Sequence, residues 1–223
     1  ITSEIKFINK GTHTRYGERL SSVIDISSKS TMSKTVKAQF GINGINADAL
    51  IEVPIIEDKL NIIGSFRRSY NDALQTFTFN QLADKVFEST KINNSDNENN
   101  MFLFLDYNVK LNFKPNKNNS LYASIISIDN QLDYTLNDSE NNRRLNDKLV
   151  TSNMGYGLGW RVKWNEKISQ NTTAFFSDYM LNYNFITREG GTQVSDFEKR
   201  NTVFDSGLSS EVIIDRSKAS QIT

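Results

Sequence analysis

The sequence predicts an all-β protein whose antiparallel strands form a transmembrane β-barrel. Three observations predict it: strict alternation of polarity, unusually long strands, and connections that alternate between short and long. The clearest alternation runs from Asn153 to Asn165, where odd positions are polar or glycine. Side chains alternate between the two faces of a strand, so one face here is apolar and the other polar. The apolar members are Met154, Tyr156, Leu158, Trp160, Val162 and Trp164.

The length of this segment separates it from most strands of soluble proteins. At about 3.3 Å per residue it spans roughly 40 Å, well beyond the usual five or six residues. A tilted strand that crosses a bilayer has this length, with apolar side chains toward lipid and polar ones toward the lumen. The segment therefore predicts a membrane-spanning strand.

Composition limits the classes of function. The 26 basic and 26 acidic residues give a net charge of zero, so we expect no nucleic-acid partner. Hydrophobic residues make up 37%, and no run reaches the ~20 apolar residues of a transmembrane helix. Cysteine is absent, which excludes disulfides and sulfur-based metal sites from the sequence. The sequence begins at Ile1 within a strand-like pattern and shows no signal peptide, so we expect a fragment of a longer protein.

The N-terminal segment, 1–33, differs from the rest. Ser3–Ile8 and Leu20–Ile26 are predicted as strands, with a turn at Lys10-Gly11. On pattern alone, this is a small hairpin of the kind found in any soluble domain.

From residue 35 onward the alternating pattern predicts about eight strands. Leu82 and Val86 permit a short helix in the connection that follows the third of these strands. The predicted strands cover 35–43, 45–55, 60–70, 103–114, 121–134, 153–165, about 168–183 and 203–215.

The connections between these strands indicate an orientation. Short turns are predicted at Glu57–Lys59, Pro115–Asn119 and Glu166-Lys167, and long polar loops at 71–100, 135–151 and 188–201. Outer-membrane barrels have short periplasmic turns and longer extracellular loops, so the loops are expected on the cell surface.

Aromatic residues fall near the strand ends, where the girdles of a barrel lie. Tyr122 and Trp164 are expected at the periplasmic rim, and Tyr70 and Tyr134 at the outer rim. A soluble antiparallel sandwich or propeller also alternates, but it rarely combines strands of this length with this loop asymmetry.

The segment Arg15-Tyr16-Gly17-Glu18-Arg19-Leu20-Ser21-Ser22-Val23-Ile24-Asp25-Ile26 resembles the end of the plug domain of TonB-dependent outer-membrane receptors. Residues 51–60, 66–70 and 175–179 are similar to barrel strands of that family. Thr12-His13-Thr14 and Glu18 depart from its usual plug residues. The resemblance implies a plug end in 1–33 and the first eight or so strands of the barrel in 34–223. The family's barrel has about 22 strands and a plugged lumen. A self-contained small barrel is the competing interpretation, and it leaves the first segment unexplained.

The resemblance implies a transport protein in the bacterial outer membrane that performs no covalent chemistry and uses no cofactor. Its implied partners are a scarce solute, outer-membrane lipid, and TonB with its inner-membrane energising complex, reached through a segment absent from this sequence. A surface lipoprotein is a further candidate partner. A surface barrel that serves as a structural or protein-binding scaffold is the alternative, and a soluble β-rich adhesin is a third interpretation.

Few residues indicate chemistry. His13 is the single histidine and is interpreted as a polar plug residue, and no catalytic, cofactor or metal residues are assigned. The acidic residues Asp129, Asp133 and Asp138 are interpreted as solvated loop charges.

One plug–wall contact is predicted. Arg15 or Arg19 would bridge to Glu52 on the inner wall, which also carries Lys37, Asp48 and Arg67, because buried arginines need carboxylate partners. Solvated charges in the lumen are an equally good interpretation of the two arginines.

Overall fold

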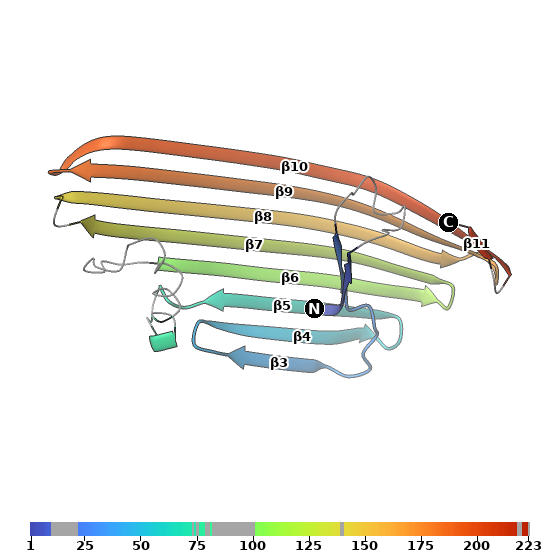
Figure 1. The fold of residues 1–223 in the computed structure, drawn as a ribbon. Helices are drawn as coiled ribbons and strands as arrows, with labels where there is room; N and C mark the ends of the chain where they lie inside the picture. The colour runs from blue at the N-terminus through green and yellow to red at the C-terminus, as the bar shows by residue number, and fades with distance from the viewer. Residues whose placement is uncertain are drawn as a thin grey trace.

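Antiparallel β-strands make up most of the described chain, which confirms the all-β prediction (Figure 1). The computed structural model describes residues 1–9, 22–72, 74, 76–78, 81, 101–138, 141–217 and 220–222. The strands are β1 Thr2–Ile8, β2 Val23–Ser28, β3 Lys37–Ile42, β4 Asn46–Ile56, β5 Leu60–Ser69, β6 Met101–Asn116, β7 Asn119–Asp138, β8 Arg143–Lys163, β9 Ile168–Glu189, β10 Thr192–Ser217 and β11 Ser220–Ile222.

The strands form two sheets. β1 and β2 pair as a hairpin, and the other nine follow the order β11-β10-β9-β8-β7-β6-β5-β4-β3, so every strand pairs with its neighbours in sequence. The large sheet is curved and open, with β3 and β11 at its edges, and the hairpin runs across its strands (Figure 1). In the described part of the chain, no helix is both long and apolar enough to cross a bilayer.

The three predicted short turns are confirmed. Residues 57–59 join β4 to β5, 117–118 join β6 to β7, and 164–167 join β8 to β9. Asp58 adopts a left-handed φ of 56° in the first of these turns. All three turns lie at the same end of the large sheet, because each follows a strand that runs in the same direction.

Two of the three predicted long loops are wrong. β7 continues to Asp138 and β8 starts at Arg143, so most of 135–151 is strand. Gly190 and Gly191, with φ of 57° and 83°, form a two-residue turn, so 188–201 belongs mainly to β9 and β10. These polar residues continue the cross-strand register, with one shift between Gln193 and Ser195. A sheet with one face exposed to water accepts polar residues. The third predicted loop, 71–100, lies largely outside the described residues, including Leu82 and Val86.

Cross-strand register defines the two faces of the large sheet. Glu52, Ile63, Lys110, Ser124 and Gly157 lie opposite one another in a single row. Their side is called the hairpin face, because Lys110 contacts the end of β2.

The other side is called the opposite face, and it carries a continuous apolar band across seven strands. The alternation predicted for 153–165 is confirmed, with Leu158 and Trp160 in this band. Its members are Ile51, Val53, Ile62, Phe66, Val109, Leu111, Leu121, Ile125, Tyr156, Leu158, Trp160, Ala174, Phe176, Leu208 and Val212.

The polarity of the two faces is exchanged farther along β7–β10. This distal half comprises 126–138, 143–155, 177–189 and 192–205, next to the turns at 141–142 and 190–191. There the opposite face is polar, with Asp129, Gln131, Asp133, Lys148 and Asn184. The hairpin face becomes apolar through Ile128, Leu132, Tyr134, Leu149, Tyr179, Leu181, Tyr183, Phe185 and Phe197.

Register corrects the predicted positions of two rim tyrosines. Tyr122 and Tyr134 lie on the hairpin face, opposite Gly159 and Asp147, so neither belongs to an outward girdle. The Trp164 ring packs edge-on against Trp160 of the apolar band, at 6.0 Å between centroids, and its position at the periplasmic rim stays a prediction. Near residue 126 of β7, the apolar side chains pass from the opposite face to the hairpin face. For this reason, the sequence pattern assigned the two faces of β7 incorrectly.

Candidate functional site

The segment that follows β2 is attached to the large sheet by a buried ion pair. Lys29 Nζ lies 2.5 Å from Glu52 Oε2, and the Glu52 side chain is only 1% exposed. Asn61 Nδ2 donates to Glu52 Oε1 and to the backbone oxygen of Thr31, each at 3.2 Å. Burial of a carboxylate requires such partners, so these contacts fix residues 29–31 on β4 and β5.

Lys110 of β6 extends the same attachment. Its Nζ donates to Ser28 Oγ at 2.6 Å and to Ser30 Oγ at 3.1 Å, and it lies 4.8 Å from the centroid of the Tyr122 ring. Lys110 is 3% exposed, and the ring and hydroxyls replace the water that its charge loses. Residues 28–31 together with Glu52, Asn61 and Lys110 are called the anchor.

The structure brings together only part of the predicted plug–wall contact. Arg15, Arg19 and His13 lie outside the described residues, so the predicted bridge from either arginine stays a prediction. Glu52 does contact the N-terminal segment, through Lys29.

Arg67 instead forms an ion pair within the large sheet. It pairs with Asp106 of the adjacent strand, and its Nε donates to that carboxylate at 2.6 Å. The Arg67 guanidinium also lies 5.1 Å from the centroid of the Phe104 ring.

Sequence reasoning identified Glu52 and missed the other members of the anchor, including its two lysines. Lys110 lies between Asn108 and Asn112 on the polar side of a predicted strand, so its face was predictable and its partner was not. Lys29 follows two serines after β2 and has no sequence signal that distinguishes it from a solvated lysine.

A polar cavity separates the hairpin from strands β8–β10 of the large sheet. It has a volume of about 570 Å³ and lies between β1–β2 and β8–β10. The hairpin presents its polar side to the cavity, and its apolar side chains Ile5, Phe7, Ile24 and Ile26 belong to the other side, each more than 60% exposed. The cavity is lined by Glu4, Lys6, Asp25, Ser27, Arg161, Asn171, Thr173, Ser209 and Glu211.

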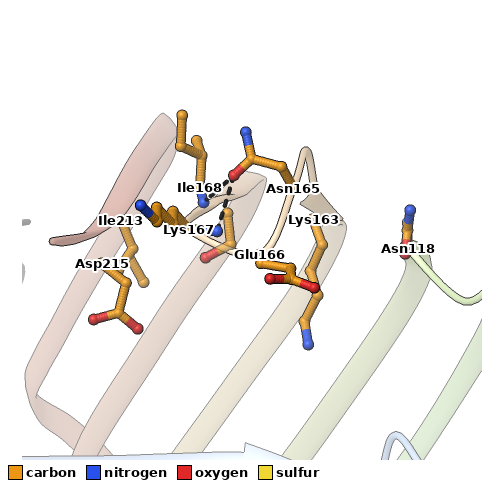
Figure 2. A pocket seen from close by; sticks show the side chains of 9 residues that line it. Asn118, Lys163, Asn165, Glu166, Lys167, Ile168, Ile213 and Asp215 are labelled. Carbon is orange, nitrogen blue, oxygen red and sulfur yellow. Dashed lines mark hydrogen bonds between the residues drawn. The ribbon is translucent and has the colours of Figure 1, made fainter. Parts of the chain in front are cut away.

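A second cavity, of about 500 Å³, lies at the end of the sheet with the short turns (Figure 2). The Asn165 side chain stabilises the turn beside it, because its Oδ1 accepts from the backbone N–H groups of Lys167 and Ile168, both at 2.9 Å. Lys163, Glu166, Lys167 and Asp215 surround the space, so its two cations are balanced by two carboxylates. This balance gives no preference for an ion of either sign.

A tyrosine–aspartate pair marks the distal half of the hairpin face. Tyr183 donates its hydroxyl proton to Asp147 Oδ1 at 2.6 Å. This hydrogen bond, with burial and the aspartate charge, raises the pKa of Tyr183 to about 12. Burial, followed by the charge of Asp147, also raises the pKa of Tyr134. Tyr183 therefore remains a neutral hydrogen-bond donor to Asp147 at physiological pH.

The remaining candidates form no reactive cluster. Asp129 and Asp133 lie on the opposite face, apart from the anchor and from the cavity beside the hairpin. Among the described residues, no group of three or more histidine, cysteine, aspartate or glutamate side chains is arranged to hold a metal.

Comparison with known proteins adds no family assignment. No protein-family model and no curated protein sequence matches this chain.

Proposed function

We propose that this chain is part of a TonB-dependent outer-membrane receptor, in which 34–223 form part of the barrel wall and 1–33 form the end of the plug. The observation that carries the proposal is the contrast between the faces of the proximal sheet. One face bears an apolar band that crosses seven strands in the row of Leu158, and the other bears buried polar groups that hold a separate hairpin. A wall between lipid and a plugged lumen needs this combination.

The apolar band supports a specific position of the bilayer. Lipid would contact the rows from Trp160 to Tyr156 on β8, together with their neighbours on the adjoining strands. The distal halves of β7–β10 would stand in water outside the cell, because their opposite face is polar. The turns at 57–59, 117–118 and 164–167 would then face the periplasm, because they lie at the end of the sheet away from the distal halves.

The sheet edges support a larger barrel than the described strands provide. β3 and β11 are edges of an open sheet, and Phe40 and Ile42 of β3 are 84% and 80% exposed. Unpaired backbone groups in lipid cost several kcal/mol each, so further strands would close the wall.

The distal hairpin face supports a role in solute capture. It gathers aromatic and aliphatic side chains with the hydrogen-bonded Tyr183–Asp147 pair on the lumen side of strands proposed to project outside the cell. A solute arriving from outside would meet this surface before it meets the hairpin.

A scaffold barrel is the second candidate function, favoured by the length of the distal strands. β10 alone has 26 residues, and a projecting sheet of this size offers a surface for proteins. Such a protein would keep the wall and the hairpin but would not depend on TonB.

The test uses the full-length protein in its natural bacterium. Membrane separation on a density gradient should place it in the outer membrane, resistant to alkaline extraction and with a heat-dependent gel mobility. Deletion of its gene and deletion of the TonB gene should produce a shared growth defect on at least one limiting nutrient. Recovery in the soluble fraction would overturn the membrane assignment. If the strain that lacks this gene grows as well as the parent on every nutrient that the TonB mutant fails to use, the scaffold function is favoured.

A further inference from the structure

One cross-strand pair of the large sheet sets two like charges against each other. Arg144 of β8 pairs with Arg188 of β9 on the opposite face, near the turn at 190–191. Like charges in this position destabilise a sheet, whereas charges of opposite sign stabilise it. Among the described cross-strand pairs of both sheets, this is the only one that joins two charges of the same sign.

The other charged cross-strand pairs follow the usual rule and join a cation to an anion. Arg143 and Glu189, the residues next to the two arginines along β8 and β9, form such an ion pair at 3.5 Å on the hairpin face. The same strand end therefore carries a compensated pair on one face and an uncompensated pair on the other. The compensated pairs are Lys6–Asp25, Lys37–Glu52, Asp48–Arg67, Arg67–Asp106, Asp133–Lys148, Asp138–Arg143 and Arg143–Glu189.

No ion pair with a described carboxylate neutralises Arg144 or Arg188. Amide residues complete their row, with Asn137 on β7 and Gln193 on β10. The next row inward on this face contains Asp196, whose carboxylate accepts from Gln193 Nε2 at 3.3 Å. Two positive charges therefore lie side by side with only amides as neighbours in their own row.

The pair lies on a well-connected strand end. Arg188 Nη1 donates to Asn146 Oδ1 at 3.3 Å, and the backbone N–H of Gly190 donates to the carbonyl of Asn142 at 2.9 Å. Arg144 is exposed and Arg188 is half-buried, so a dissolved ligand reaches both. The planar guanidinium group is pre-organised, which lowers the entropy lost for each hydrogen bond that it forms.

Phosphate is the anion that matches this arrangement. A guanidinium group binds phosphate through two parallel N–H donors, so two arginines can hold several oxygens of one group. A phosphate monoester carries a charge of about −1.5 to −2 at pH 7, which balances two arginines, whereas a carboxylate balances one.

We propose that Arg144 and Arg188 form a binding site for a phosphate group carried by a cell-surface glycan. The phosphate chemistry rests on the register and the charges of the pair. The glycan as its carrier rests on the proposed receptor function, in which this face of the distal half stands outside the cell and away from the lumen. The site is therefore separate from the surface proposed for solute capture, which belongs to the hairpin face.

Phosphorus NMR tests the site in the full-length protein, purified in dodecyl maltoside and phosphate-free buffer, with mannose 6-phosphate as the probe. Arg144→Gln and Arg188→Gln should each weaken binding about tenfold, because each removes hydrogen bonds to a charged group. Arg200→Gln is the matched control, since Arg200 lies on the same face across from Asn182, and it should bind like the parent. Equal affinity of Arg144→Gln and the parent would overturn the site. Equally strong competition by glucuronate would overturn the preference for phosphate.

Thermal unfolding provides a second readout. Arg144→Glu gives this row the opposite-charge pairing of the other rows, so it should raise the thermal midpoint in phosphate-free buffer and abolish probe binding. Mannose 6-phosphate should raise the midpoint of the parent and not that of Arg144→Glu, because a ligand stabilises the folded state that binds it. An unchanged midpoint in Arg144→Glu without the probe would show that the two arginines do not repel each other, and the inference from register would fail.

The glycan is tested with surface polysaccharide from the natural bacterium, immobilised before and after hydrofluoric acid removes its phosphate. The parent should be retained by the untreated material only, and Arg144→Glu by neither. Equal retention of the parent on both materials would disprove glycan phosphate as the ligand, even where mannose 6-phosphate binds. A protein found in the soluble fraction would remove the receptor function and the glycan, while the NMR titration would still decide whether the arginine pair binds phosphate.

Discussion

Lys29 and Glu52 form the closest described ion pair between the N-terminal segment and the large sheet, with Nζ 2.5 Å from Oε2. The two side chains differ in burial, since Lys29 is 35% exposed and Glu52 is 1% exposed. Loss of the ion pair should therefore cost more free energy at the buried carboxylate than at the lysine, which water still reaches. This asymmetry makes the anchor testable by replacing one partner at a time.

Lys29→Met should lower the free energy of unfolding by about 1–3 kcal/mol, because it leaves a buried carboxylate with fewer partners. Lys29→Arg should lose less, since the charge is kept. The double variant Lys29→Met/Glu52→Gln should recover part of the loss. Urea unfolding of the full-length protein in detergent gives these values. Equal stability of Lys29→Met and the parent would show that the pair does not hold the hairpin.

We expect that position 159 must be glycine, because the Tyr122 ring occupies the space of a Cβ there. A Cβ at Gly159 would overlap that ring, which also lies beneath the Lys110 ammonium group. Overpacking of this kind costs about 1–3 kcal/mol, so Gly159→Val should lower the thermal midpoint. Gly159→Val/Tyr122→Ala should regain part of the loss.

Gly64→Ala is the matched control for this prediction, because its new methyl group would meet Ile51 Cγ2 at an ordinary 3.5 Å. If Gly64→Ala and Gly159→Val shift the thermal midpoint equally, then the Tyr122 contact is not the cause.

A matched pair on β8 tests where the membrane ends. Leu158 and Val150 are both apolar and lie on the opposite face, one in the apolar band and one in the distal half. An arginine toward lipid costs about 2–4 kcal/mol at the bilayer midplane and little outside it. Leu158→Arg should therefore reduce the amount of assembled protein in the outer membrane, and Val150→Arg should not. Equal assembly of the two variants would contradict the proposed position of the bilayer.

The Tyr183–Asp147 pair predicts a late-titrating tyrosine. The pKa of Tyr183 rises to about 12 from an ordinary 10.0, so the folded state favours the neutral phenol. Its contribution to stability is complete below pH 10.0 and is lost as the pH rises through about 12. Difference titration of phenolate absorbance between the parent and Tyr183→Phe should reveal one tyrosine that ionises near the upper value. Asp147→Asn should move this ionisation to lower pH.

The proximal half of the fold could be predicted from the sequence because alternation there is nearly strict. The face of each side chain from Gly155 to Val162 follows from its position alone. The distal half could not be predicted in this way, because polar residues such as Asn146 and Lys148 have the composition of a loop. Their strand state depends on partners that are distant in the sequence, such as Asn184 opposite Lys148.

The contacts of the anchor also could not be predicted from local sequence patterns. Glu52 was placed on the inner wall from its position in a strand, and the structure puts it on the hairpin face. Its partner Lys29 comes from a segment that reaches β4 only through tertiary packing, so no local pattern identifies it.

The most direct test of the proposed membrane wall uses two neighbouring positions of β8. The chain contains no cysteine, so Trp160→Cys and Arg161→Cys add unique thiols to this part of the protein. In full-length protein assembled in outer membranes, Trp160→Cys should react with a lipid-phase maleimide and resist an aqueous one. Arg161→Cys should resist the lipid-phase reagent, because it lies on the hairpin face. Free aqueous labelling of Trp160→Cys, or identical labelling at both positions, would contradict the assignment of this sheet as a membrane wall.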